Sequence, residues 1–335
     1  MRNQWSTFGQ TTQDSDMVYG EDVTRRDWLA ATVIGLAGAT LVSESRAETN
    51  VAKLDAGPFR VCLNTSTIRG QKLSVDKQIA VAAQAGYDGI EPWIGDLRAF
   101  VESGGKLSDL RKQLDDANLQ VESAIGFAKW IVDDESERKA GIEELKRDSE
   151  MIRTLGGTRM AAPPIGAHDA NAAVMDLRVV AERYRAALEV GVGMGVVPMA
   201  EVWGFSKNLS RLSETVSVIV AAGHPAACLL PDFYHLYRGG SSFEGLNLLS
   251  KNAIHVFHIN DYPAREHTSL NDSDRVYPGD GDCPIVPILK GLRANGISCA
   301  LSLELFNKDL WEQDALQVCQ TGAAKVRAMI AKAME

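Results

Sequence analysis

Four polar residues stand directly after apolar runs in the second half of the sequence, and each has a side chain that can bind a cation or transfer a proton. The runs are short and rich in leucine, valine and alanine, which is typical of buried strands. A carboxylate or an imidazole at the end of such a run is costly to remove from water unless it is paired or coordinates a cation. The four residues are Glu201, Asp232, His258 and Glu304.

Together these side chains offer three carboxylates and one imidazole. This donor set suits Mn2+, Mg2+, Co2+ or Zn2+ and leaves coordination positions for the oxygens of a substrate. Any one of the residues alone is also explained by an ion pair at a strand end or by a buried histidine with satisfied hydrogen bonds. Because four successive apolar runs end in this way, we predict that they share one divalent metal ion.

The elements that must position these residues alternate between strand-like and helix-like segments. This alternation is the pattern of repeated βα units around a parallel sheet. Eight such units predict a (β/α)8 TIM barrel, an α/β fold whose active site lies at the carboxyl ends of the strands. We expect strands at 59–64, 89–92, 121–125, 158–161, 196–202, 227–232, 254–259 and 298–303, and helices at 75–85, 137–155, 171–190, 209–222, 285–294 and 311–333.

An open, doubly wound sheet is the structural alternative. That fold places a glycine-rich phosphate-binding turn after its first strand. Here the residues from Asn64 to Thr67 read Asn-Thr-Ser-Thr. The sequence also contains no internal linker or repeat, so we favour one catalytic barrel domain over residues 48–335.

The first 47 residues resemble a twin-arginine export signal. Arg25 and Arg26 precede an apolar run over 29–42, and residues 45–47 end in Ala47. A run of about 14 residues is short for a bilayer span, which needs roughly 20. We predict cleavage after Ala47 and a periplasmic or extracellular barrel with no membrane attachment. An uncleaved membrane anchor and an ordinary surface helix are the alternatives.

The composition excludes several function classes. The chain has 35 lysines and arginines against 44 aspartates and glutamates, a formal net charge of -9. Because affinity for nucleic acid comes largely from basic side chains that neutralise phosphates, a nucleic-acid partner is not expected. The five cysteines include no CxxC pair, so neither a disulfide framework nor a cysteine zinc site is indicated.

Six pieces of the sequence carry a family resemblance. They are 85–91 (AGYDGIE), Glu201, 232–235 (DFYH), 257–261 (FHIND), 275–281 (RVYPGDG) and 301–306 (LSLELF). Together they resemble the xylose isomerase-like TIM barrels, the sugar phosphate isomerases and epimerases that include ketose 3-epimerases and inosose isomerases and dehydratases. The resemblance covers residues 59–333.

The resemblance implies that the four strand-end residues are the metal ligands and that Glu201 and Glu304 also act as an acid/base pair. The implied activity is a metal-dependent isomerisation or epimerisation of a sugar, keto-sugar or inosose, in which a proton leaves the carbon next to a carbonyl and an enediolate forms. The implied partner is a small carbohydrate. Family members commonly form dimers or tetramers, so a homo-oligomer is expected.

Further residues are implied to contact the substrate. His235 corresponds to a family histidine that contacts substrate oxygens, with a solvent-facing loop histidine as the alternative. Arg275 and Arg265 compete for the role of a family arginine, since a guanidinium can donate two hydrogen bonds to a sugar oxygen or carboxylate. Ketose 3-epimerases carry an extra glutamate after the ligand on the fifth strand. Lys207 occupies that neighbourhood here and favours a more acidic substrate.

Two residues that follow earlier strands are expected at the same barrel mouth. Glu91 ends the second strand and either contacts substrate or holds a metal ligand through a hydrogen bond. Trp130 follows the third strand and either presents its face to a sugar ring or packs in the interior.

Three other functions fit the same fold. An apurinic endonuclease of the endonuclease IV type needs three zinc ions and histidines after the second and third strands, but the first of the six histidines is His168. A dehydratase, lyase or hydrolase acting on an inosose-like ring or a 3-keto-glycoside would begin with the same proton abstraction. A non-catalytic sugar-binding protein would lack a ligand residue, and all four are present.

Overall fold

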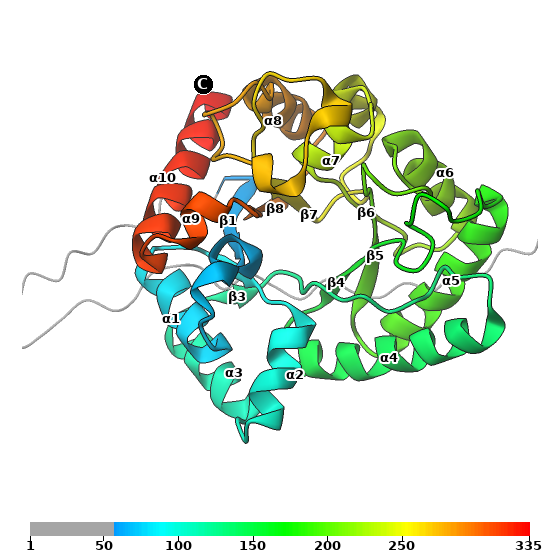
Figure 1. Cartoon of the computed structure of the whole chain (residues 1–335), viewed down its shortest axis with the longest axis horizontal. Coiled ribbons are helices and arrows are strands. Elements are labelled where there is room, and N and C mark those ends of the chain that lie inside the picture. The colour runs from blue at the N-terminus through cyan, green and yellow to red at the C-terminus, as the bar shows by residue number, and fades with distance from the viewer. Residues whose placement is uncertain (1–56) are drawn as a thin grey trace, which may run out of the picture. The chain divides into compact units, whose positions relative to one another are not determined.

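The computed structural model describes residues 57–335, which form a barrel of parallel strands inside a ring of helices (Figure 1). The expected export segment, residues 1–47, lies outside these described residues. No helix within 57–335 has both the length and the apolar character that a membrane crossing requires.

Eight parallel strands make up the barrel, in the order β3-β2-β1-β8-β7 and β4-β5-β6. The two groups meet where the amide of Ala161 donates to the carbonyl of Ala124, and where Asp232 and His258 form a parallel bridge. β1 pairs with both β2 and β8, which closes the ring. The strands are β1 (Phe59–Asn64), β2 (Gly89–Glu91), β3 (Gln120–Val121), β4 (Arg159–Ala162), β5 (Val197–Glu201), β6 (Leu229–Leu230), β7 (Val256–Ile259) and β8 (Cys299–Leu303).

Helices surround the strands, and most follow the strand of their own βα unit (Figure 1). Several begin at an aspartate that accepts a hydrogen bond from an amide of the first turn, as Asp134 and Asp314 do. The α-helices are α1 (Val75–Gln84), α2 (Ile94–Glu102), α3 (Leu107–Asp116), α4 (Glu135–Thr154), α5 (Leu177–Gly193), α6 (Leu212–Ala222), α7 (Phe233–Arg238), α8 (Ile285–Ala294), α9 (Lys308–Trp311) and α10 (Ala315–Met334). Four 3-10 turns join them: η1 (Thr65–Gln71), η2 (Phe243–Leu248), η3 (His267–Ser269) and η4 (Asp272–Asp274).

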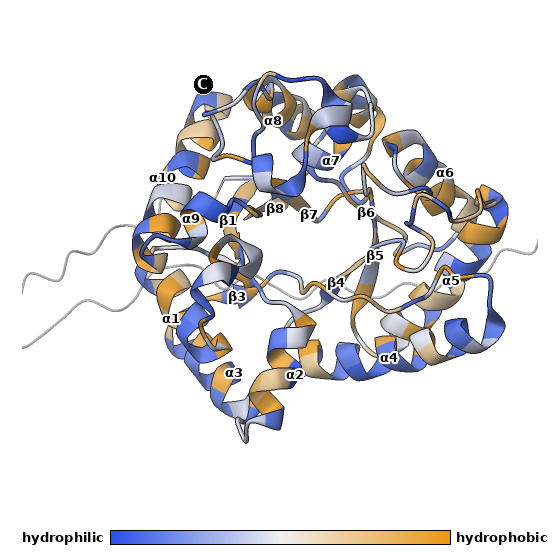
Figure 2. Cartoon of the chain, viewed as in Figure 1, coloured by the Kyte–Doolittle hydropathy of each residue, from blue (hydrophilic) through white to orange (hydrophobic). Residues whose placement is uncertain are grey.

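The apolar core lies between the strands and the helices. Leu63, Leu301 and Leu303 of the strands are fully buried, and so are Val180 and Leu289 on the helices that cover them. Helices of the outer ring carry both hydrophobic and hydrophilic residues, as expected for elements with one buried and one solvated face (Figure 2).

The predicted α/β barrel is confirmed, and β1 and α8 have the predicted bounds. Two predicted strands are much shorter in the structure, because β3 covers only Gln120–Val121 and β6 only Leu229–Leu230. The chain leaves the regular ladder early at both places, yet Ile125 and Asp232 still form single bridges to the neighbouring segments. The residues at these strand ends therefore stay at the mouth of the barrel.

Candidate metal centre

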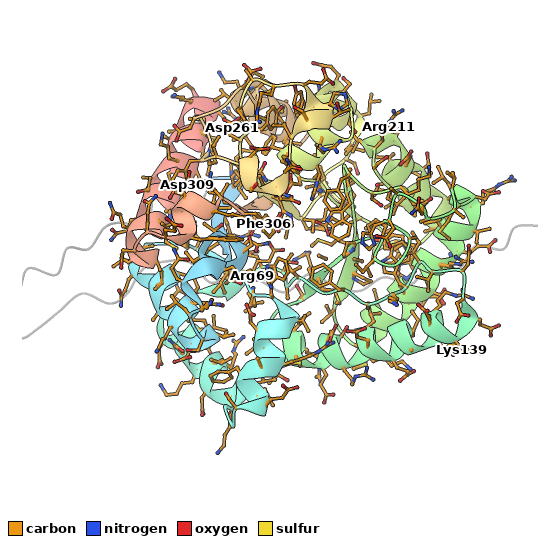
Figure 3. The ribbon with its side chains drawn as sticks, viewed as in Figure 1. Arg69, Lys139, Arg211, Asp261, Phe306 and Asp309 are labelled. Carbon is orange, nitrogen blue, oxygen red and sulfur yellow. The ribbon has the colours of Figure 1, made fainter. Side chains whose placement is uncertain are left out.

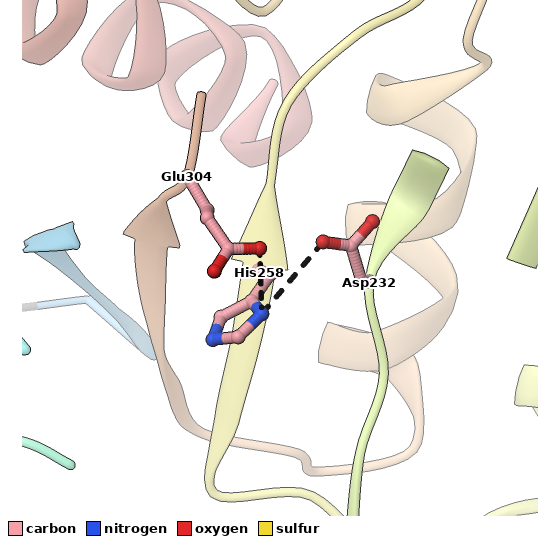
Figure 4. Close-up of side chains that lie close together, drawn as sticks. All are labelled: Asp232, His258 and Glu304. Atoms are coloured by element: carbon pink, nitrogen blue, oxygen red, sulfur yellow. Dashed lines mark ion pairs between the residues drawn. The ribbon is translucent and has the colours of Figure 1, made fainter. Parts of the chain in front are cut away.

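Three carboxylates surround one imidazole nitrogen at the carboxyl ends of the strands. The Nδ1 atom of His258 lies 3.2 Å from Glu304 Oε2, 3.7 Å from Asp232 Oδ2 and 3.8 Å from Glu201 Oε1. Donor atoms of Asp232, His258 and Glu304 all lie within 4.8 Å of one another (Figure 4). The four residues singled out by the sequence therefore come together in space.

Consecutive elements bring these side chains to one place. Glu201 is the last residue of β5, and His258 lies within β7. Asp232 is the N-cap of α7, where its Oδ1 accepts from the amide of His235 at 2.8 Å and its Oδ2 is left to face His258. Glu304 follows β8, and its amide donates to the carbonyl of Ile259 at the end of β7. The barrel register thus sets the arrangement.

Glu91 holds the other side of the His258 ring. Its Oε2 lies 3.0 Å from His258 Nε2 and also accepts from Ser302 Oγ at 2.7 Å and from Asn64 Nδ2 at 3.0 Å. All four of these side chains are fully buried. When His258 is neutral, as a metal ligand must be, this carboxylate keeps the proton on Nε2 and leaves the Nδ1 lone pair free for a cation.

The residues fit a divalent cation. The Nδ1 atom of His258 is buried and has no hydrogen-bond partner among the described residues, although three carboxylates face it. An unpartnered buried nitrogen costs free energy, and three carboxylates held close together repel one another. A divalent ion bound by Glu201, Asp232, His258 and Glu304 would relieve both costs.

Arg275 brings a fixed positive charge to the same carboxylates. Its Nη1 donates to Asp232 Oδ2 and Glu304 Oε2, at 2.8 Å in each case, and its Nη2 donates to Asp272 Oδ1 at 2.6 Å. The guanidinium is about 1% exposed and lies over the rings of Tyr234 and Phe306. The structure therefore places Arg275, rather than Arg265, in the site.

Burial and charge change the pKa values of the site. Burial raises the pKa of Asp232 to about 6 although Arg275 opposes the change, and burial together with neighbouring carboxylates raises that of Glu201 well above its usual value. Burial alone would lower the pKa of His258, but Glu304 and Glu91 raise it well above the usual value. His258 and Arg275 outweigh burial at Glu304 and lower its pKa. In the metal-free site, Glu201, Asp232 and His258 therefore hold protons more strongly than the same groups do in water.

His235 lies beside Arg275 and is neutral. Its Nε2 accepts from Arg275 Nη2 at 3.1 Å, and burial followed by the charge of Arg275 lowers its pKa well below the usual value. Its Nδ1 is buried and has no hydrogen-bond partner within the described chain. Because Nε2 accepts a hydrogen bond, the proton of the neutral ring is on Nδ1. This unsatisfied N–H group is suited to donate to a substrate oxygen.

A cavity of about 240 Å3 opens next to the centre. Both Glu201 and Glu304 line it, whereas the other two candidate ligands do not. The cavity is small beside the pockets of roughly 300–1,000 Å3 that hold drug-sized molecules, which suits a ligand the size of one sugar. The remaining lining residues are Trp93, Ile125, Phe127, Trp203, Phe205, His235, Asp272, Arg275 and Phe306.

The aromatic wall of this cavity is a part of the site that the sequence reasoning missed. Neighbouring rings lie 5.0–6.4 Å apart, as in Trp93 with Phe127 at 5.3 Å and Trp203 with Phe205 at 5.0 Å. A signal was present, because three of the rings follow a strand-end glutamate by two residues. Side chains two apart on an extended chain point to the same side. The pairs are Glu91 and Trp93, Glu201 and Trp203, and Glu304 and Phe306.

Three other residues expected at the mouth lie elsewhere. Trp130 is fully buried and its Nε1 donates to the carbonyls of Ala162 and Pro163, so its face is not open to a sugar. Lys207 is exposed and does not line the cavity. Arg265 is about half exposed, pairs with Asp274 and does not line the cavity.

Comparison with known proteins places this site in a family. Residues 79–325 match the model of the xylose isomerase-like TIM barrel. The chain belongs to that family. An inosose isomerase of Bacillus velezensis is 23% identical over 283 residues, which cover 82% of this chain and 98% of the relative. A 3-dehydroshikimate dehydratase of Pseudomonas putida is 22% identical over 242 residues, 70% of this chain and 36% of the relative.

Two solved structures share the fold of this chain. A crystal structure of the IOLI protein with a bound zinc atom has a TM-score of 0.75 at 21% identity and covers 82% of this chain and 98% of its own. A structure of L-ribulose 3-epimerase has a TM-score of 0.66 at 18% identity, covering 82% of this chain and 95% of its own. The relatives of this family member are thus isomerases, epimerases and a dehydratase.

Proposed function

We propose that the protein is a divalent-metal-dependent isomerase or epimerase that moves a proton at a carbon next to the carbonyl of a keto-sugar or an inosose. The observation that carries the proposal is the convergence of Glu201, Asp232 and Glu304 on the unpartnered Nδ1 of His258 beside a sugar-sized cavity. The similarity to inosose isomerases and to a zinc-containing structure supports the same class.

The two glutamates that line the cavity are the groups that would exchange the proton. Glu201 and Glu304 are each about 4% exposed and reach the cavity, whereas Asp232 and His258 are fully buried and serve only to hold the ion. When bound, the ion supplies positive charge that acidifies a C–H bond next to a carbonyl. Its place on the cavity wall lets the Glu201 carboxylate accept a proton from a bound substrate.

Arg275 and His235 would orient the substrate. The guanidinium of Arg275 is fixed by three carboxylates and two rings, so it presents its remaining surface to the cavity without much loss of side-chain entropy. The neutral His235 offers one N–H donor. The aromatic rings pack against the C–H faces of the sugar and exclude water.

A dehydratase is the second candidate, because one relative is a 3-dehydroshikimate dehydratase and the first step of both reactions is the same proton removal. The two outcomes differ in whether the proton returns or a β-hydroxyl leaves. Measuring the loss of water as well as the exchange of the proton distinguishes the two reactions.

The test begins with residues 48–335, with bound metal measured by elemental analysis. Free ketoses, inososes and 3-keto-glycosides are then incubated in deuterated water. Exchange of a substrate C–H without loss of water supports an isomerase or epimerase, and exchange with loss of water supports the dehydratase. Failure to bind any divalent metal supplied in excess, together with no exchange, contradicts the proposal.

Glu304→Gln and Glu201→Gln separate an enzyme from a binding protein. Each variant should lose about 100-fold or more in turnover while it keeps affinity for the sugar. Glu122→Gln is the matched control, since Glu122 is also a buried glutamate but pairs with Arg60 at 2.6 Å at the start of β1. Equal turnover in Glu304→Gln and Glu122→Gln would contradict the acid/base roles.

Export is part of the same proposal. A barrel that leaves the cytosol would meet free sugars, sugar acids or glycosides rather than phosphorylated intermediates. All five cysteines are free and four of them are buried, so the thiols are protected once the barrel has folded. This state is compatible with a route that carries folded proteins.

A further inference from the structure

A guanidinium covers one wall of the cavity from outside. Arg69 Cζ lies 3.8 Å from the centre of the Trp93 ring, close enough for a cation–π contact. Trp93 lines the cavity, and its Nε1 donates to Asn64 Oδ1 at 3.0 Å. Asn64 in turn donates to Glu304 Oε1 at 3.0 Å. Figure 3 shows Arg69 together with Phe306 inside the ring of helices. Arg69 thus does not line the cavity itself but contacts the ring of Trp93, which does.

Arg69 has no anionic partner in the part of the chain that the structure describes. Its side chain is exposed, and it forms neither an ion pair nor a side-chain hydrogen bond with any residue of 57–335. By contrast, Lys129 pairs with Glu137, and Arg275 of the site pairs with Asp232. The donors of Arg69 are therefore free for a ligand.

The segment that carries Arg69 is held in place. The Nε1 atom of Trp311 donates to the carbonyl of Ser66 at 3.0 Å, and Gln71 Nε2 donates to the carbonyls of Leu310 and Gln313 at 2.9 Å. Thr65, Ser66, Thr67 and Ile68 of the same turn are buried. The backbone of this turn is therefore fixed, and the exposed side chain of Arg69 lies on Trp93.

The charges of the cavity fix the direction in which an anionic substrate can enter. Three carboxylates, those of Glu201, Glu304 and Asp272, line the cavity against one guanidinium, and that guanidinium of Arg275 already donates to Glu304 and Asp272. A negative group inside the cavity is therefore repelled. A substrate with one carboxylate is therefore held best with its carbonyl end inward and its carboxylate at the rim. Arg69 is the unpaired cation that the rim offers at the Trp93 wall.

We propose that Arg69 binds the carboxylate of the substrate, which makes the substrate an acidic keto-polyol such as a sugar acid or a hydroxylated ring acid. A guanidinium matches a carboxylate with two parallel hydrogen bonds. A phosphate would call for more donors, and the turn after β1 reads Asn-Thr-Ser-Thr instead of a glycine-rich phosphate loop. This inference rests on the proposed function, of which it specifies the substrate class.

The experiment compares matched acids and neutral derivatives on the full-length protein loaded with Mn2+. The pairs are 3-dehydroshikimate and its methyl ester, and glucuronate and glucuronamide. Affinity is measured by calorimetry for the native chain, Arg69→Met and Lys72→Gln. The methionine keeps an apolar stem on Trp93 but removes the charge. Lys72 is an exposed residue of the same segment, so it serves as the control for loss of one nearby positive charge.

The native protein should bind the acid of at least one pair about tenfold more tightly than the neutral derivative, the effect of one charge-assisted hydrogen-bonded pair. Arg69→Met should abolish that preference and leave the affinity for the neutral derivative unchanged, whereas Lys72→Gln should keep it. The preference should also fall as salt is added.

The inference is overturned if the protein binds both members of every pair with equal affinity or binds neither. It is also overturned if Lys72→Gln loses the preference for the acid as much as Arg69→Met does. Failure of the proposed function gives a different result. If the protein prefers the acids through Arg69 but exchanges no C–H proton in deuterated water, the inference about the anion stands and the proposed isomerase function fails. If the protein exchanges C–H protons of neutral keto-sugars but shows no preference for acids, the proposed isomerase function stands and the inference about Arg69 fails.

Discussion

Glu91 determines what His258 can bind. Three donors converge on its Oε2 atom, from His258, Ser302 and Asn64, and all of these groups are shielded from water. The acceptance by Glu91 keeps the proton of neutral His258 on Nε2. The hydrogen bond from Nε2 to Glu91 on one side of the ring therefore leaves Nδ1 free to bind a metal ion on the other side.

Replacing Glu91 with glutamine should weaken metal binding. The amide can donate as well as accept, so it no longer requires a proton on His258 Nε2, and loss of such a partner typically costs about 10- to 100-fold in metal affinity. Competition with a chelator measures the change. Glu122→Gln should leave metal affinity unchanged, and equal affinities for Glu91→Gln and the native protein would contradict the assigned role.

Metal uptake should release protons. The pKa of Asp232 is raised to about 6 in the metal-free protein, and the pKa values of Glu201 and His258 are raised as well, so protons compete with a cation for these groups. Apparent metal affinity should therefore fall as pH decreases through 6. Calorimetry at pH 7 in buffers of different ionisation enthalpy reports the released protons. A metal affinity that is constant between pH 5 and pH 7 would contradict this prediction.

The convergence of the four candidate metal ligands could be predicted from the sequence because the signal is local. Each of the four follows an apolar run, and a barrel brings all strand ends to one mouth. The same rule applied to the first strand indicates Asn64, which the structure places between Glu91 and Glu304. The choice between Arg275 and Arg265 was not accessible in this way. It depends on a loop whose path is fixed by contacts such as Tyr237 Oη with the carbonyl of Arg265.

Long-range contacts explain why helices in the structure differ from the predicted ones. The helix predicted at 171–190 begins at Leu177 in the structure. The preceding backbone is held by Asn208, which accepts from the amide of Met175 and donates to the carbonyls of Ala167 and Ala173. Asp176 then caps α5. Because Asn208 is more than thirty residues from Met175, its effect on the start of the helix cannot be seen in the local spacing of apolar residues.

Helices α2, α3 and α7 were absent from the prediction. Gly104 and Gly105 stand between α2 and α3, and Gly104 has a φ of +95°, so the chain reverses there and the apolar period is interrupted. α7 covers only Phe233–Arg238, which is too short for a period to be recognised. This short helix nevertheless carries His235 into the site.

The contact of η1 with α9 predicts a loss of stability in Gly70→Ala. A methyl group at Gly70 would lie 2.1 Å from Trp311 Cβ and 3.0 Å from its Cα, so one segment must move. The expected cost is about 1–3 kcal/mol of unfolding free energy. Gly95→Ala is the matched control, because an added methyl in exposed α2 meets nothing within 4 Å and should stabilise by up to about 1 kcal/mol. Urea unfolding distinguishes the two, and equal midpoints would contradict the prediction.

At the scale of the whole molecule, the export proposal makes a prediction about residues 1–47. A reporter fused to this segment should leave the cytosol only when both arginines before the apolar run are present, since that pair is the feature that the twin-arginine route reads. Replacing Arg25 and Arg26 together with lysine should retain the reporter, and Arg2→Lys should not. Cell fractionation gives the result. Retention of the unmodified fusion, or export of the double variant, would contradict the proposal.

The closure of the barrel between β1 and β8 has a consequence for biosynthesis. Thr67 Oγ1 donates to the carbonyl of Leu303 and accepts from the amide of Leu305, so the start of the barrel is tied to residues made more than 230 positions later. While the chain is still on the ribosome, β1 therefore lacks one of its two neighbours. Asn64 also has no Glu304 to bind until then. Glu304 and the last strand are made together, so the candidate metal centre can be complete only after translation of the barrel has finished.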